Sequence, residues 1–156
     1  SAANTYTGGT VVTGGAGSVL QAQVDGALGG GNVAVDDGST LQLDSAAAIG
    51  ANADVLLSGT APVVNLIFGG TANIRALSYN GGATYQPAGT YGPIGSGAAH
   101  EDARFTGSGL LNVAAAPSTT LLAASGGASD LIAPPVNGWL PSPTPAPPKL
   151  PPAITA

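Results

Sequence analysis

The chain has 156 residues, only 7% of them charged, and its formal net charge at neutral pH is −5. Arg75, Arg104 and Lys149 are its only basic residues, so it offers no basic patch for nucleic-acid phosphates or an anionic membrane surface. The lack of cysteine excludes disulfide bonds and thiolate metal sites, and no apolar run approaches the roughly 18 residues of a membrane-spanning helix.

The first 115 residues alternate short apolar stretches with turns rich in glycine, asparagine and aspartate. Within these stretches apolar and polar residues alternate with period two, which is typical of β-strands with one buried face. Glycine supplies the left-handed backbone of tight corners and disfavours helix interiors by about 1 kcal/mol relative to alanine. We therefore predict an all-β body without a helix longer than two turns. The predicted strands are residues 10–13, 18–24, 32–35, 40–43, 54–57, 63–68, 73–79, 103–105 and 110–113.

Many short strands separated by glycine-rich turns favour a coiled β architecture, either a solenoid or a sandwich. The apolar residues are mainly valine, leucine, isoleucine and alanine rather than aromatic residues, which suits a narrow interior. One coil of such a fold cannot bury its apolar face alone, so its stability comes from stacking on the next coil.

Composition changes near Ala116, because all 13 prolines except Pro62, Pro87 and Pro93 follow it. Closely spaced prolines favour an extended polyproline II conformation. We therefore divide the chain into a β-rich body, residues 1–115, and a proline-rich, extended C-terminal tail, residues 116–156.

Residues 4–10, Asn-Thr-Tyr-Thr-Gly-Gly-Thr, resemble the signature of the bacterial autotransporter-associated β-strand repeat. The resemblance implies a right-handed parallel β-helix, or β-solenoid, that is secreted and then displayed or released outside the cell. Members of this family serve as passenger stalks, adhesins and surface structures. Further segments that carry the resemblance are residues 27–29, 32–35 and 38–43, and, for the closing part of such repeats, 64–70, 88–92 and 105–113.

One dense cluster of ionisable groups contains His100, Glu101, Asp102 and Arg104. Its functional interpretation is general acid–base catalysis or weak metal binding, with the histidine as proton carrier. The alternative is a polar loop, which we favour because one histidine cannot build a multi-histidine site and no nucleophile pair lies nearby.

Asp36, Asp37 and Gly38 form a second candidate site, since carboxylate and carbonyl oxygens bind calcium. Calcium-binding repeats of β-helices need a regular Gly-Gly-x-Gly-x-Asp series, and this chain has no such series. A plain turn is the favoured interpretation, because aspartate and glycine dominate turns. We predict no metal and no cofactor.

Enzymes that cleave acidic sugars on a β-helix combine stacked carboxylates with arginine and lysine. Residues 1–115 contain two arginines and no lysine, and few aromatic residues that could stack on sugars. We therefore predict that the chain is not an enzyme and has no catalytic residue. Tyr85 and Tyr91, on either side of Pro87, are predicted to cap the stacked strands, with a partner contact as the alternative.

Sparse charge promotes association, and a neighbouring copy can satisfy the unpaired backbone groups at the ends of stacked strands. We predict a secreted structural protein whose partners are copies of itself, in an extracellular filament built through these ends and the tail. Contacts that do not close into a ring generate such helical polymers. The tail holds short apolar stretches and the single tryptophan, a favoured interface anchor. The predicted self-assembly residues are Leu121, Leu122, Leu131, Ile132, Trp139 and Leu140.

The alternative function is a surface passenger or adhesin module that contacts a host or matrix glycan. For both functions we expect an extracellular or cell-surface location. The chain opens with the small residues Ser1, Ala2 and Ala3, which are typical of the site where a signal peptide is removed.

Overall fold

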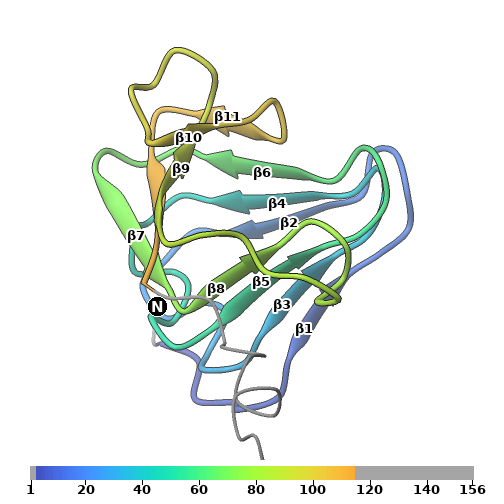
Figure 1. Cartoon of the computed structure of the whole chain (residues 1–156). Coiled ribbons are helices and arrows are strands. Elements are labelled where there is room, and N and C mark those ends of the chain that lie inside the picture. Colours follow the sequence, from blue (N-terminus) through green and yellow to red (C-terminus); the bar gives the residue numbers. More distant parts are fainter. Residues whose placement is uncertain (1–2, 115–156) are drawn as a thin grey trace, which may run out of the picture. The chain divides into compact units, whose positions relative to one another are not determined.

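The computed structural model describes residues 3–114 of the chain. Within this range there are twelve strands and no helix, so the prediction of an all-β body is confirmed (Figure 1). The predicted tail at residues 116–156 lies outside the described residues.

Sheet A consists of four parallel strands. Their order is β1 (Thr10–Val12), β3 (Val33–Val35), β5 (Asp54–Leu57) and β8 (Ala76–Ser78). Every second side chain of these strands points towards the interior, because successive residues of a strand face opposite sides of the sheet.

Sheet B is also parallel throughout. Its order is β2 (Val19–Ala22), β4 (Thr40–Leu43), β6 (Val63–Leu66) and β11 (Phe105–Gly107).

Sheet C is mixed. Its order is β7 (Thr71–Ile74), β12 (Leu110–Val113), β9 (Gly89–Gly92) and β10 (His100–Glu101). Strand β12 is parallel to β7 and antiparallel to β9, and β9 is parallel to β10.

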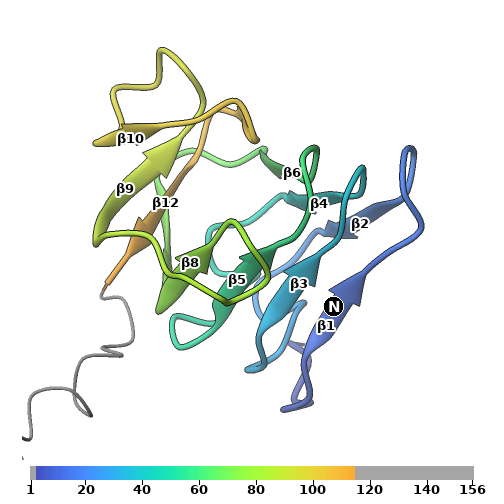
Figure 2. The same cartoon turned by 45° about the vertical axis from the view of Figure 1, so that its right-hand side comes forward.

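The pairing repeats at a nearly constant spacing along the sequence. Thr10 of β1 pairs with Val33 of β3, which pairs with Val55 of β5, and side-chain hydrogen bonds join residues 21 to 23 positions apart. Successive strands of sheets A and B are therefore added in one direction, starting from β1 and β2 (Figure 2).

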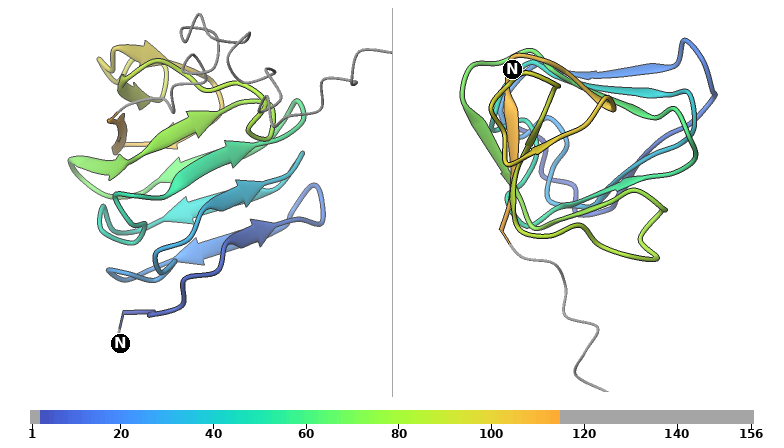
Figure 3. Two further views of the ribbon diagram at one scale, coloured as in Figure 1. Left: turned by 60° about the horizontal axis from the view of Figure 1, so that its bottom comes forward. Right: turned by 45° about the horizontal axis from the view of Figure 1, so that its top comes forward.

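The inward-facing residues of the three sheets form one apolar core, and the sheets lie on three sides of it (Figure 3). Val33, Leu41, Leu43 and Val64 have no exposed surface. The buried residues are mainly aliphatic, as the composition predicts, and the largest fully buried side chains, Tyr91 and Phe105, come late in the chain.

The predicted single strand at residues 73–79 is wrong, because β7 and β8 belong to different sheets. Arg75 separates them at a bend, where its N–H donates to the carbonyl oxygen of Ala53 at 2.9 Å. Its guanidinium binds the carboxylate of Asp54. These two contacts turn the chain from sheet C into sheet A.

Strands β9 and β10 were not predicted, and the predicted strand at 103–105 actually occupies Phe105–Gly107. Strand β9 begins and ends with glycine, which weakens its local strand signal; its pairing with β12 compensates. The shift of β11 follows from a turn, in which Asp102 accepts the N–H groups of Arg104 and Phe105.

Gly107 lets the chain leave β11 for β12. Its φ is +93°, and a Cβ atom there would clash with the carbonyl oxygen of Leu66. That oxygen accepts the N–H groups of Ser108 and Gly109 at 2.8 and 3.0 Å, so no larger residue fits this crossing.

We expect Leu43→Ala to lower the free energy of unfolding by about 2–5 kcal/mol, because it leaves a cavity in a fully buried site. Urea unfolding followed by circular dichroism measures this loss. Val11→Ala, at a mostly exposed position, is the control and should change stability by at most about 0.5 kcal/mol. Equal losses in both variants would contradict the assignment of the core.

Candidate functional site

The cluster at residues 100–104 is divided among several structural contacts. The His100 ring stacks on the Tyr91 ring, with 4.6 Å between centroids. Glu101 accepts the N–H groups of Gly95 and Gly97 at 2.9 and 2.8 Å. These two donors lower the pKa of the Glu101 carboxyl, with the Gly95 contribution the larger. Glu101 thus holds the loop between β9 and β10.

Asp102 and Arg104 form an ion pair within the same cluster, with 3.0 Å between Nη1 and Oδ2. The guanidinium carbon also lies 4.6 Å from the centroid of the Tyr79 ring, a cation–π contact. Burial raises the pKa of the Tyr79 phenol. Each ionisable group of the cluster has a structural partner, which favours the interpretation as a polar loop over that of a catalytic site.

Asp37 links two neighbouring turns of the stack. Its Oδ1 accepts the N–H groups of Thr60 and Ala61 at 2.9 and 2.7 Å. Asp36 accepts the N–H of Ser39 through its main-chain carbonyl, and Gly38 has a φ of +72°. This geometry is that of a turn, and within residues 3–114 no three histidine, cysteine or acidic residues gather as metal ligands would.

An ion pair between the buried Asp54 carboxylate and the half-exposed Arg75 side chain links the beginnings of β5 and β8 in sheet A. Asp54 is only 2% exposed, and the Arg75 guanidinium donates two hydrogen bonds of 2.7 Å to its carboxylate. The side-chain hydrogen bond and the charge of Asp54 raise the pKa of Arg75. The Asp54 N–H donates to Asn32 Oδ1 at 3.0 Å. Asn32, Asp54 and Arg75 thus form a column of polar residues across neighbouring strands, which the sequence analysis missed. The signal that could have revealed it is the separation of 22 and 21 residues between its members.

A second polar column, the sheet B ladder, runs along the outside of sheet B. It consists of Gln21, Gln42, Asn65 and Thr106, which occupy paired positions on adjacent strands. Asn65 donates to Gln42 at 3.2 Å, and Thr106 donates to Asn65 at 3.0 Å. Asp44 receives the amides of Gln21 and Gln42 at 2.6 and 2.9 Å. Stacked amides of this kind stabilise in-register parallel strands.

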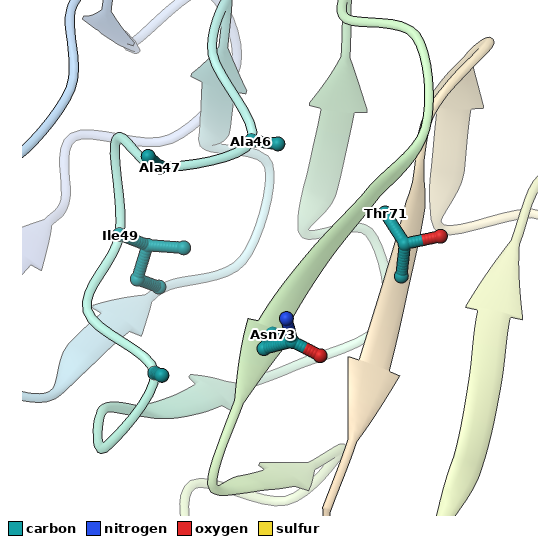
Figure 4. A pocket seen from close by; sticks show the side chains of 6 residues that line it. Ala46, Ala47, Ile49, Thr71 and Asn73 are labelled. Carbon is teal, nitrogen blue, oxygen red and sulfur yellow. The ribbon is translucent and has the colours of Figure 1, made fainter.

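A pocket of about 330 Å³ lies between β7 and the turn that precedes β5 (Figure 4). Ala46, Ala47, Ile49 and Ala51 line one side, and Thr71 and Asn73 the other. Its lining has no ionisable group, and its only polar side chains are those of Thr71 and Asn73.

Residues 79–105, which include β9 and β10, form one end of the stack of strands, called the capped end here. The Tyr91 hydroxyl donates to the Pro87 carbonyl at 2.8 Å, and its ring packs 6.3 Å from the Phe105 ring. The Gln86 N–H donates to the Leu77 carbonyl at 2.8 Å, on β8. This geometry fits the predicted capping role of Tyr91, and Tyr85 is half-buried in the same region.

The opposite end, the N-terminal edge, is formed by β1 and β2. Among residues 3–114 neither strand has a strand partner on its outer side, and Val11 and Val19 are 63% and 58% exposed. The two strands contain no charged residue and no proline, which are the usual protections of a free edge. This edge can accept another strand through main-chain hydrogen bonds.

The predicted self-assembly residues are not tested by this geometry. Leu121, Leu122, Leu131, Ile132, Trp139 and Leu140 all lie outside the described residues. In the described part of the chain no helix is long and apolar enough to cross a membrane.

We expect Arg75→Ala to lower the melting temperature by several degrees, because it leaves the buried Asp54 carboxylate without its cation. Arg75→Lys should recover only part of the loss, since lysine cannot form two parallel hydrogen bonds. Arg104→Ala, which removes the cation from the more exposed Asp102 carboxylate, 24% against 3% for Asp54, is the matched control with a smaller effect. Unchanged melting of Arg75→Ala would mean that the pair contributes no stability.

The lowered pKa of Glu101 predicts a dependence on pH. Its contribution to stability is present above the ordinary glutamate pKa and is lost as the pH falls through the lower folded pKa. Glu101 is the only glutamate of the chain, so its carboxyl carbon gives one glutamate signal to titrate by NMR. Glu101→Gln should melt lower than the unmodified chain at neutral pH, with the difference shrinking in acid. A signal that titrates at or above the ordinary value would refute this role.

Comparison of the chain with protein-family models, with curated proteins and with solved structures finds no match.

Proposed function

We propose that this chain is a secreted, non-enzymatic structural protein that assembles with copies of itself into an extracellular filament. We further propose that its parallel strands are coils of a right-handed parallel β-helix, as the resemblance to the autotransporter-associated repeat implies. The spacing of 21 to 23 residues between hydrogen-bonded partners in the two polar columns supports this coil, since each coil would return the chain to the neighbouring strand.

The observation that carries the proposal is the unprotected N-terminal edge. Two strands present free main-chain groups and exposed valines at one end of the stack, and such an edge favours pairing with another chain. The low charge of the whole sequence, 7%, does little to oppose association.

The two ends of the stack differ, and this affects how a filament would grow. At the capped end the outer edge of β8 in sheet A already accepts a hydrogen bond, from the Gln86 N–H to the Leu77 carbonyl. Growth therefore needs a second contact, which we assign to the tail and its residues Leu121, Leu122, Leu131, Ile132, Trp139 and Leu140. Trp139 would be the anchor of that contact, since tryptophan is enriched among residues that dominate interfaces.

The second candidate is a surface passenger or adhesin module. The sheet B ladder favours it, because amide and hydroxyl groups at regular spacing on an outer sheet face could hydrogen-bond to a glycan. In that case the protein would remain as single short particles.

Negative-stain electron microscopy of the purified full chain tests the proposal. Long uniform fibres are expected, whereas isolated short particles at all concentrations would reject the filament and favour the adhesin module. Trp139→Ala should reduce the polymerised fraction several-fold without altering the β-type circular dichroism, and Trp139→Phe, which keeps an aromatic anchor, should reduce it less. Deletion of residues 117–156 should leave assembly poor or absent; normal fibres from that variant would show that the tail is not required.

A further inference from the structure

The free main-chain groups of β2 can be assigned residue by residue. The carbonyl oxygens of Ser18 and Ala22 accept the N–H groups of Thr40 and Asp44 at 2.8 and 2.9 Å, so they point towards β4. Alternate residues of a strand direct their main-chain groups to opposite edges. Val19, Gln21 and Gln23 therefore direct their N–H and C=O groups towards the free edge.

The capped end cannot serve as the partner of this edge in a second copy. The loop at residues 93–97 rises beyond β11 (Figure 1), where Glu101 fixes it through Gly95 and Gly97. A copy stacked in the same direction would meet this loop before its β2 reached β11. The N-terminal edge is therefore left to pair with the same edge of another copy, and such an isologous contact has twofold symmetry.

In a twofold-symmetric antiparallel pair, only one register brings Val19, Gln21 and Gln23 all into pairing, and it is centred on Gln21. In an antiparallel pair, residues directly opposite each other share a face, so Gln21 lies opposite Gln21 of the other copy and Val19 opposite Gln23. Leu20, half-buried in this structure, would lie opposite Ala22 on the inner face. This places a large side chain against a small one.

We propose that two copies of this chain pair β2 with β2 in an antiparallel manner about a twofold axis at Gln21. The Gln21 main-chain N–H of each copy donates to the C=O of the other. Gln21 Nε2 already donates to Asp44 at 2.6 Å, and its second N–H can reach Oε1 of the symmetry-related Gln21. The sheet B ladder then runs through both copies without interruption.

A second copy presents an identical strand to this edge. The β2 edge carries no charge that a partner would have to neutralise, so two uncharged copies of β2 can approach each other without repulsion. The inference rests on the proposed function only in that copies associate, and it names a contact distinct from that of the tail.

The absence of cysteine from the whole chain allows a direct test. Full-length Gln21→Cys should give a covalent dimer with a short thiol-specific cross-linker, which suits an expected Cβ separation of about 5.5 Å across the axis. Ile94→Cys, at a 73% exposed position of the capped end, is the matched control and should not cross-link to itself. A mixture of Gln21→Cys and Thr106→Cys chains tests stacking in one direction, in which these two positions would be adjacent.

Covalent dimers of Gln21→Cys, absent from Ile94→Cys, support the proposal. Cross-links that need both Gln21→Cys and Thr106→Cys would overturn it in favour of stacking in one direction. The lack of any Gln21→Cys dimer would also overturn it, and would leave β2 to the tail or to another protein.

A charge at the edge provides an independent measurement. Val19→Lys in the full chain should weaken the dimer at least tenfold in sedimentation, whereas Ile94→Lys should leave it unchanged; equal behaviour of the two variants would reject the β2 contact. Fibres without a Gln21 cross-link would reject this inference and keep the proposed function. Cross-linked dimers without fibres would support the β2 contact and reject the proposed filament.

Discussion

Main-chain hydrogen bonds between parallel strands hold successive turns of this chain in one register, and the other features of the structure depend on that register. Since neighbouring strands lie roughly 4.8 Å apart, side chains at paired positions meet in columns. Inward columns pack as the apolar core, and outward columns such as Gln42 and Asn65 hydrogen-bond to each other. A shift of one residue would move every buried side chain to the outer face.

The same register lets a few charged residues bind groups on neighbouring turns and strands. Asp37 bonds to the turn that contains Thr60, Asp54 binds Arg75, and Asp44 receives two glutamines. These three carboxylates therefore link a turn to its neighbour or support a polar column. Acidic residues that look dispersed in the sequence become ties between adjacent levels of the stack.

The sequence predicted the parts of the fold that local alternation controls. Residues such as Leu41 and Leu43, with a polar partner between them, identify their strand and its buried face. Arg75 lies inside an apolar stretch and gave no local sign of a bend, because the residue that holds it, Asp54, is 21 positions away. Strand β9 is defined by its pairing with β12, a non-local contact that no local pattern contains. The polar columns were recognisable only once the spacing between strands was known.

The order of pairing along the chain has a consequence for how the protein is completed during synthesis. Strand β6 acquires its second neighbour, β11, and strand β7 its one strand neighbour, β12, only from residues 39 to 41 positions later. Until those residues emerge, the apolar side chains of Ala72 and Ile74 belong to a strand that has no β12 beside it. Pairing at such separations is slower than local pairing because a longer loop must close. Folding should therefore proceed from the first strands, and sheet C should form last. The chain should be most prone to aggregation before β12 has been synthesised.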